Sequence, residues 1–259
     1  MLLLVLFSAL LCVLTAYALR GSLATGTPVI YSGFDGISVI AGFIMFVAAA
    51  SVLGTAFGVA LILSCLLHEL GHFLAHRMLG HSATRFRLAP ILTREPSSDT
   101  PLTTEGQAFF VALMGPGLCL APVAFAMTTS FALADIAPVT ADYLVIFAVT
   151  CGAFNFVNLL PFFPLDGGRC ARIAANNFWP ALAPAMTVFM AAAFASASIR
   201  LGSVSLMVMA GIGAHSLLRR SEDQLVPMGG DRALVGLTAY SFTLAAHFTA
   251  GWTLYDAYY

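Results

Sequence analysis

The chain has 259 residues, of which 60% are hydrophobic and only 9% are charged, whereas soluble domains carry about 25% charged residues. Its net charge is −1, and all 11 basic residues are arginines, with no basic run that could follow a nucleic-acid backbone. The mean hydropathy is +0.93. This composition excludes a disordered chain, a nucleic-acid binder and an ordinary soluble enzyme, and it predicts a protein that crosses the lipid bilayer several times.

The weakly charged stretches predict the membrane-spanning helices, because a helix crosses the hydrocarbon core in about 20 residues. Little sequence lies outside these stretches, and no separate soluble domain is expected. We therefore predict a single membrane-embedded domain over 1–259, with an all-α polytopic fold of six to eight transmembrane helices. The expected spans, in chain order, are 1–19, 37–53, 56–78, 106–130, 143–165, 181–199, 202–218 and 233–255.

The first two apolar stretches each have an alternative interpretation. Residues 16–18 (Ala-Tyr-Ala) resemble a signal-peptidase site, but no basic residue precedes them, so we expect 1–19 to be a retained span. The stretch 37–79 corresponds to about 64 Å of helix, twice the thickness of a bilayer core. Two spans with a tight turn near Gly54-Thr55 are therefore expected instead of one.

The arginines predict the orientation of these spans. With eight spans, ten arginines share one side of the membrane and only Arg200 lies on the other; with 37–79 as a single span, the ratio would be nine to two. Because arginine and lysine accumulate in cytoplasmic loops, the arginine-rich side is expected to be the cytoplasmic side of the cell membrane.

The sharpest motif is His68-Glu69-Leu70-Gly71-His72, within the third predicted span. Ionisable residues inside a span are costly and point to function. Histidines at positions i and i+4 of a helix lie on one face and can bind one Zn²⁺. Glu69 is then suited to act as a general base toward a water molecule. The alternatives are coincidence, or side chains that only form hydrogen bonds with neighbouring helices.

Residues 84–92 follow this span and contain a short alternation of polar and apolar residues, at Thr84-Arg-Phe-Arg-Leu88. Such alternation is typical of a strand. We therefore expect a candidate β-hairpin near residues 84–92, whose edge would receive an unwound peptide. The alternative is a solvated basic loop.

Asp166 is the best candidate for a third ligand, because a catalytic zinc ion usually has three protein ligands. It lies 94 residues after His72, at the end of an otherwise charge-free stretch that contains Pro161 and Pro164. Prolines break a helix, and irregular backbone at membrane depth is tolerated only inside protein or beside water. The alternative is a turn or helix-capping aspartate. The remaining histidines are not expected to be ligands: His76, His81, His215 and His247.

Together these motifs resemble the site-2 proteases, a family of intramembrane zinc metalloproteases. The resemblance rests on His68-Glu-Leu-Gly-His72 and on Asn158-Leu-Leu-Pro-Phe-Phe-Pro-Leu-Asp166-Gly-Gly-Arg169. Between them, Ala112-Leu-Met-Gly-Pro116 is similar to the family's Ala-Gly-Pro span. The resemblance covers about residues 56–172, which we predict to be the metalloprotease core.

The resemblance implies one zinc ion per chain, bound by His68, His72 and Asp166. It also implies that Glu69 is the catalytic base and that Asn158 contacts the substrate or the developing oxyanion. The active site would face the cytoplasmic side, and the substrate would be a membrane-anchored protein. This chain departs from the family pattern at Cys119, where members often have Asn. It would be a minimal form, without a PDZ domain or a C-terminal regulatory domain.

The sequence therefore favours an intramembrane zinc endopeptidase that acts in regulated intramembrane proteolysis. Two alternatives use the same residues. One is a divalent-metal transporter, although no second H-E-x-x-H motif indicates the repeated halves common in transporters. The other is a non-catalytic metal-binding scaffold in the membrane, although a structural zinc site does not need Glu69.

Overall fold

The structure is a computed structural model that describes residues 1–23, 29–32, 36–81, 84–87, 98–162, 165–218 and 225–258. In this part of the chain it contains α-helices and one pair of short strands. The elements are α1 Leu2–Leu23, β1 Val29–Ser32, α2 Gly36–Leu53, α3 Thr55–Met78, β2 Thr84–Arg87, α4 Glu105–Leu133, α5 Pro138–Asn158, α6 Asp166–Phe178, α7 Leu182–Leu201, α8 Val204–Leu218 and α9 Gly230–Tyr258.

The predicted all-α polytopic fold is confirmed. Six described helices are long and apolar enough to cross a membrane: α1, α3, α4, α5, α7 and α9. Two shorter apolar helical segments, Val39–Leu53 in α2 and Leu206–Leu217 in α8, match the other two predicted spans. The chain is thus a multi-pass membrane protein.

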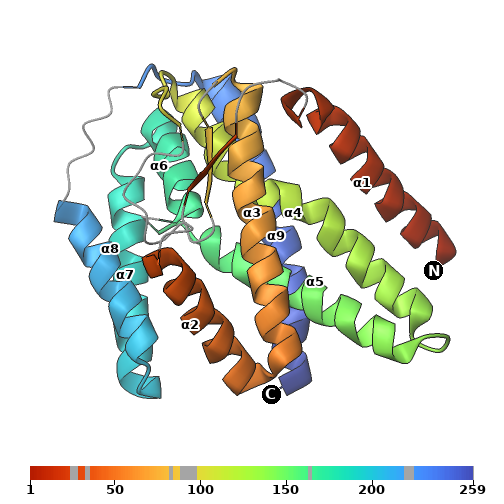
Figure 1. Cartoon of the computed structure of the whole chain (residues 1–259). Coiled ribbons are helices and arrows are strands. Elements are labelled where there is room, and N and C mark those ends of the chain that lie inside the picture. Colours follow the sequence, from red (N-terminus) through yellow and green to blue (C-terminus); the bar gives the residue numbers. More distant parts are fainter. Residues whose placement is uncertain are drawn as a thin grey trace. The chain divides into compact units, whose positions relative to one another are not determined.

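The turn between α2 and α3 lies where the sequence predicts it. Gly54 separates the two helices with φ 104°, a backbone conformation that glycine adopts without steric cost. Its N–H donates to Ala50 O at 3.0 Å, and its own carbonyl accepts from Phe57 N at 3.1 Å. These bonds satisfy backbone groups at the helix ends, so α2 and α3 form a helical hairpin (Figure 1).

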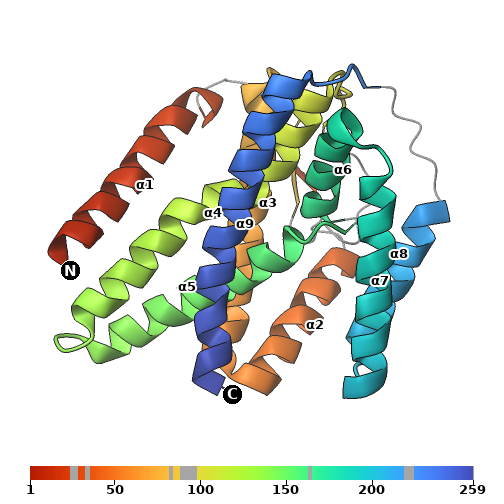
Figure 2. The same cartoon turned by 180° about the vertical axis from the view of Figure 1, so that it is seen from behind.

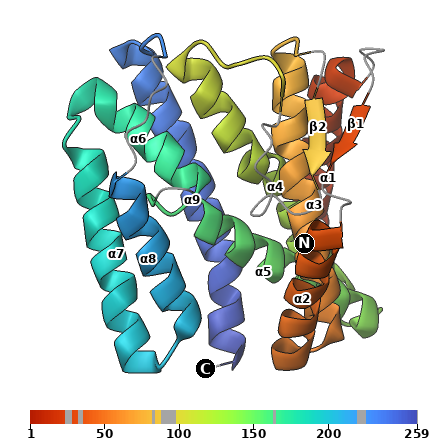
Figure 3. The same ribbon diagram turned by 60° about the vertical axis from the view of Figure 1, so that its left-hand side comes forward.

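The strand predicted after α3 is present, but its partner differs from the predicted hairpin. β2 pairs in parallel with β1, Val29 opposite Thr84 and Ser32 opposite Arg87, and the two strands lie side by side in Figure 3. Thr84 also forms an isolated antiparallel bridge with Ser98. Alternation along a strand indicates its faces but not its partner, since the partner comes from a distant segment. Residues 88–92 of the predicted hairpin lie outside the described residues.

The chain forms two compact units, and the first comprises residues 1–101, 114–157 and 245–259. In this unit α4 and α5 are joined by a tight turn (Figure 2), in which Leu133 O accepts from Ile136 N and Ala137 N. Two groups of buried apolar side chains make its core. One gathers around Cys119, Val123, Ala126, Ala148 and Cys151, and the other around Leu19, Phe73, Leu74 and Leu118.

The second unit comprises residues 102–113 and 158–244. Its core includes Phe109, Leu159, Cys170 and Ile173. Helices α7 and α8 form an antiparallel hairpin (Figure 3), and Gly202 caps the end of α7 at the turn between them. The Glu105 carboxylate is buried and accepts hydrogen bonds from Asn177 Nδ2 at 3.1 Å and from the backbone N–H of Met228 at 3.0 Å. It therefore joins the start of α4, the end of α6 and the segment before α9.

The break predicted around Pro161 and Pro164 is confirmed. α5 ends at Asn158, seven residues before the predicted end of that span, and α6 begins at Asp166. Within the break, Leu159 is fully buried and its carbonyl accepts a hydrogen bond of 2.6 Å from Tyr240 Oη. This bond satisfies a backbone group that the interrupted helix leaves unpaired.

Candidate metal centre

The histidine motif lies on one of the most buried candidate spans. In α3, 56% of the most apolar window is buried, against 11% in α1 and in α7. His68 is 3% exposed and Glu69 is 6% exposed. A buried imidazole and carboxylate need polar partners or an ion, so the location of these residues agrees with a functional site.

The two histidines of the motif face each other, as the helical spacing predicts. His68 Nε2 and His72 Nε2 are 3.0 Å apart, and the rings meet edge to face with their centroids 4.7 Å apart. Two nitrogens bound to one tetrahedral Zn²⁺ at 2.0–2.1 Å would be separated by about 3.3 Å. The two Nε2 atoms are therefore close to the spacing of ligands that share an ion.

Asp166 is the first residue of α6. With His68 and His72 it makes a set of three side chains that could bind a metal ion. The N-cap of α6 is Leu165 and no side-chain hydrogen bond caps the helix, so the alternative of a helix-capping aspartate is not supported. In the first turn the Asp166 carboxylate is favoured by the positive end of the helix dipole.

Two glycines allow the backbone of α4 to approach α3 closely at this site. A Cβ atom on Gly71 would lie 2.1 Å from Met114 O, and a Cβ atom on Gly115 would lie 2.5 Å from His72 Nε2. Small residues permit such close packing of membrane helices. The Ala-Leu-Met-Gly-Pro segment of α4 therefore has a steric role, because only glycine at position 115 leaves room for the imidazole of His72.

Asn155 is a neighbour of the histidines that the sequence analysis did not single out. It is fully buried in α5, and its Oδ1 lies 2.8 Å from His68 Nδ1. Its Nδ2 donates to Cys151 O at 2.9 Å. A polar residue inside a charge-free span, three positions before Asn158, is the signal that could have drawn attention to it.

Glu69 and Asn158 are the two residues for which sequence predicts chemical roles. No hydrogen bond or ion pair joins the Glu69 carboxylate to another described residue. Asn158 is the last residue of α5 and is half-buried at the start of the break. The roles of both residues stay predictions.

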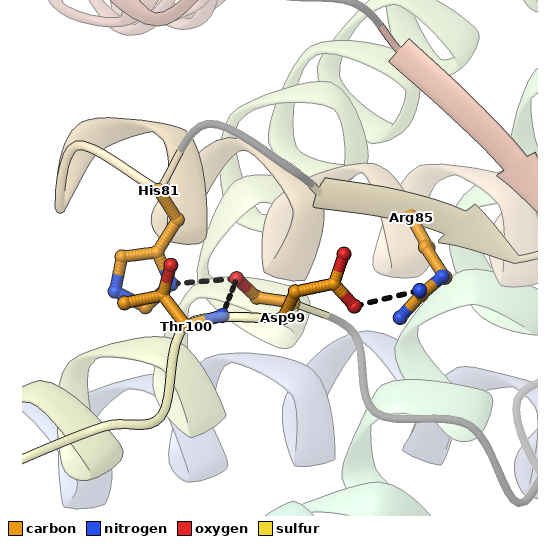
Figure 4. A network of polar contacts seen from close by, with 5 residues as sticks. His81, Arg85, Asp99 and Thr100 are labelled. Atoms are coloured by element: carbon orange, nitrogen blue, oxygen red, sulfur yellow. Dashed lines mark hydrogen bonds and ion pairs between the residues drawn. The ribbon is translucent and has the colours of Figure 1, made fainter.

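The other described histidines lie outside the cluster, as expected. His247 is fully buried in α9 and bonds to Pro116 O at 2.9 Å, and His215 is exposed on α8. His81 follows α3, where its Nδ1 contacts Ser98 Oγ at 2.9 Å and His76 Nδ1 at 3.2 Å. The backbone N–H of Thr100 also donates to Ser98 Oγ, at 3.2 Å. Figure 4 shows His81 and Thr100 in this network, with the ion pair of Arg85 and Asp99 nearby.

Comparisons with known proteins add one structural likeness. No protein-family model and no curated protein matches this sequence. Among solved structures, the Site-2 Protease from Methanocaldococcus jannaschii is similar, with a TM-score of 0.48 and 16% sequence identity over 78% of this chain and 95% of that chain.

Proposed function

We propose that this protein is an intramembrane zinc metalloendopeptidase, which cleaves peptide bonds in or near the transmembrane segments of membrane-anchored proteins. The observation that carries the proposal is the H-E-x-x-H motif on a membrane-spanning helix, with His68 and Glu69 buried and the Nε2 atoms of His68 and His72 3.0 Å apart. Asp166 is the candidate third ligand. A structural zinc site in a scaffold would not need a glutamate between the two histidines, and no second H-E-x-x-H motif indicates the repeated halves common in transporters.

The donor set fits zinc. Two imidazole nitrogens and one carboxylate oxygen form a ligand set typical of catalytic zinc sites, which keep a further position open for water or substrate. When bound, the ion supplies the Lewis acidity that makes water a nucleophile near neutral pH and polarises a peptide carbonyl. We expect one zinc ion per chain.

The remaining chemistry is assigned to side chains of this chain. Glu69 accepts a proton from the attacking water and transfers it to the nitrogen of the leaving amine, as a general base and then a general acid. Asn158 donates a hydrogen bond from its amide to the oxygen on which negative charge develops. No covalent intermediate with the protein is required.

The substrate class and the orientation follow from the location of the motif. A site on a membrane-spanning helix reaches peptide bonds of other membrane spans or of the residues next to them, and a helical substrate must unwind before its backbone is accessible. The ten-to-one distribution of arginines predicts that the active site faces the cytoplasm.

A carboxylate-to-amide variant tests the function. We expect the purified parent protein, loaded with zinc, to cleave a single-span membrane substrate. Glu69→Gln should lower the cleavage rate at least about 100-fold, the usual contribution of a general base, while it keeps one zinc ion per chain. Asp142→Asn is the matched control, because Asp142 is exposed near the start of α5 and should keep the parental rate.

Other outcomes would contradict the proposal. Parental cleavage by Glu69→Gln would remove the assigned base. Zinc flux into proteoliposomes without cleavage would favour a transporter, and zinc binding with neither cleavage nor flux would favour a scaffold.

A further inference from the structure

We propose that Asn155 is the positioning residue of the metal centre: its amide fixes which nitrogen of His68 carries the proton and thereby presents the Nε2 lone pair to the ion. The inference rests on the proposed metal site. It assigns a role to a residue outside the ligand set, on the basis of a buried chain of hydrogen bonds from α5 to α3.

The orientation of the Asn155 amide is set by its second partner. Asn155 Nδ2 lies 2.9 Å from the carbonyl oxygen of Cys151, one turn earlier in α5. A carbonyl only accepts hydrogen bonds, so the group facing it must be the NH₂ of the amide. The amide oxygen therefore points the other way, toward His68, where Oδ1 and Nδ1 are 2.8 Å apart.

The orientation of the amide then determines the tautomer of His68. Because Asn155 Oδ1 can only accept, His68 Nδ1 must donate and therefore carries the hydrogen. In a neutral imidazole the other nitrogen, Nε2, then holds the free lone pair. This is the nitrogen that lies 3.0 Å from His72 Nε2, on the side of the candidate ligand cluster.

Burial makes this control strong. Asn155 is 0% exposed and His68 is 3% exposed, so water is a poor substitute for either partner, and an unsatisfied amide or imidazole group would be costly there. The Phe154 ring meets His68 edge to face at 5.4 Å and restrains the imidazole from the same helix. Outer partners of this kind orient metal-binding histidines, and their loss typically weakens metal affinity by about 10- to 100-fold.

Zinc affinity, measured by competition with a chelator, tests the proposal in the full-length protein. Asn155→Leu removes the acceptor at similar volume and should weaken affinity by about 10- to 100-fold. Asn155→Asp keeps an acceptor oxygen for His68 Nδ1 but loses the donor to Cys151 O, so its zinc affinity should lie between that of Asn155→Leu and that of the parent. The matched control is Thr150→Val, on the same helix, because Thr150 Oγ1 is buried without a described hydrogen-bond partner; it should bind zinc like the parent.

A second measurement reads the tautomer directly and does not depend on folding of a variant. In metal-free parent protein with ¹⁵N-labelled histidine, the His68 signals, assigned by their loss in His68→Gln, should report a protonated Nδ1 and an unprotonated Nε2. Parental zinc affinity in folded Asn155→Leu, or a protonated Nε2 in the parent, would overturn the proposal. If the parent binds zinc but cleaves nothing, the proposed function fails, and the zinc affinities of the variants still test the role of Asn155. If the parent binds no zinc, the proposed function also fails, and the measured tautomer of His68 alone tests the role of Asn155.

Discussion

Among single residues, Gly115 matters to the candidate metal centre because it has no side chain. Gly115 faces the histidines of α3 with no side chain, and the nearest ring nitrogen would lie 2.5 Å from an added Cβ. Real Cβ atoms do not approach so closely, and buried residues of a packed interior have little room to move. The position therefore constrains the imidazole of His72 directly.

Gly115→Ala should disrupt the metal centre. The added methyl group would displace His72, and we expect zinc affinity to fall by at least about tenfold, since misplaced ligands and outer partners have effects of this size. Zinc binding by competition is the measurement. Gly117→Ala, on the same helix, is the control, because a Cβ atom at Gly117 would have no neighbouring atom within 4 Å. Equal losses of zinc affinity in both variants would contradict the steric explanation.

His81 predicts a pH dependence of stability. Burial lowers the pKa of His81 below its ordinary value of 6.5, so the unfolded chain binds this proton more readily than the folded protein does. The contribution of the neutral His81 ring to the free energy of unfolding is fully present above about pH 6.5 and is lost as the pH falls below that value. The melting temperature should decrease between about pH 7.5 and pH 5.5, and by less in His81→Gln.

The control for this prediction is His215→Gln, at an exposed histidine on α8. It should keep the full parental pH dependence. An unchanged pH dependence in His81→Gln would show that other groups are responsible for it.

At the scale of elements, the important feature is the interruption between α5 and α6. The sequence indicates it through Pro161, Pro164 and the paired glycines after Asp166. α6 itself was not predicted, because a 13-residue helix with a polar face has no hydrophobic stretch long enough to mark it as a span. Its position within its unit is fixed by tertiary bonds, above all those of Glu105.

Glu105→Ala should destabilise the unit that contains α6. The substitution leaves the buried backbone N–H of Met228 without its acceptor and removes one of the two acceptors of the half-buried Asn177 Nδ2. Hydrogen bonds to a charged acceptor contribute about 1.5–3 kcal/mol each. We expect the free energy of unfolding to fall by about 2 kcal/mol or more, seen as a lower thermal midpoint in detergent. Glu105→Gln keeps one acceptor oxygen and should lose less; equal losses would argue against this explanation.

At the scale of the whole molecule, the arginine distribution predicts the orientation of the chain in the membrane. Gly229 precedes α9 and Ser203 lies between α7 and α8, on opposite predicted sides. With a membrane-impermeant thiol reagent on intact cells, Ser203→Cys should be labelled and Gly229→Cys should be labelled only after permeabilisation. Four of the five native cysteines are buried, so the parent protein provides a low background, and labelling of Gly229→Cys from outside would contradict the orientation.

Sequence alone was enough to establish the membrane class, the main helical spans and the turn at Gly54, and it predicts the three candidate metal ligands. These features depend on local composition and on helical periodicity, since the spacing of His68 and His72 alone places both on one face of a helix. The tertiary structure decided what non-local packing controls: the parallel pairing of β2 with β1, the steric role of Gly115, the Glu105 contacts and the Asn155 hydrogen bond to His68. Sequence periodicity does not indicate which distant segment supplies the partner of a buried hydrogen bond or packs closely against a helix. Only the folded chain brings those partners together.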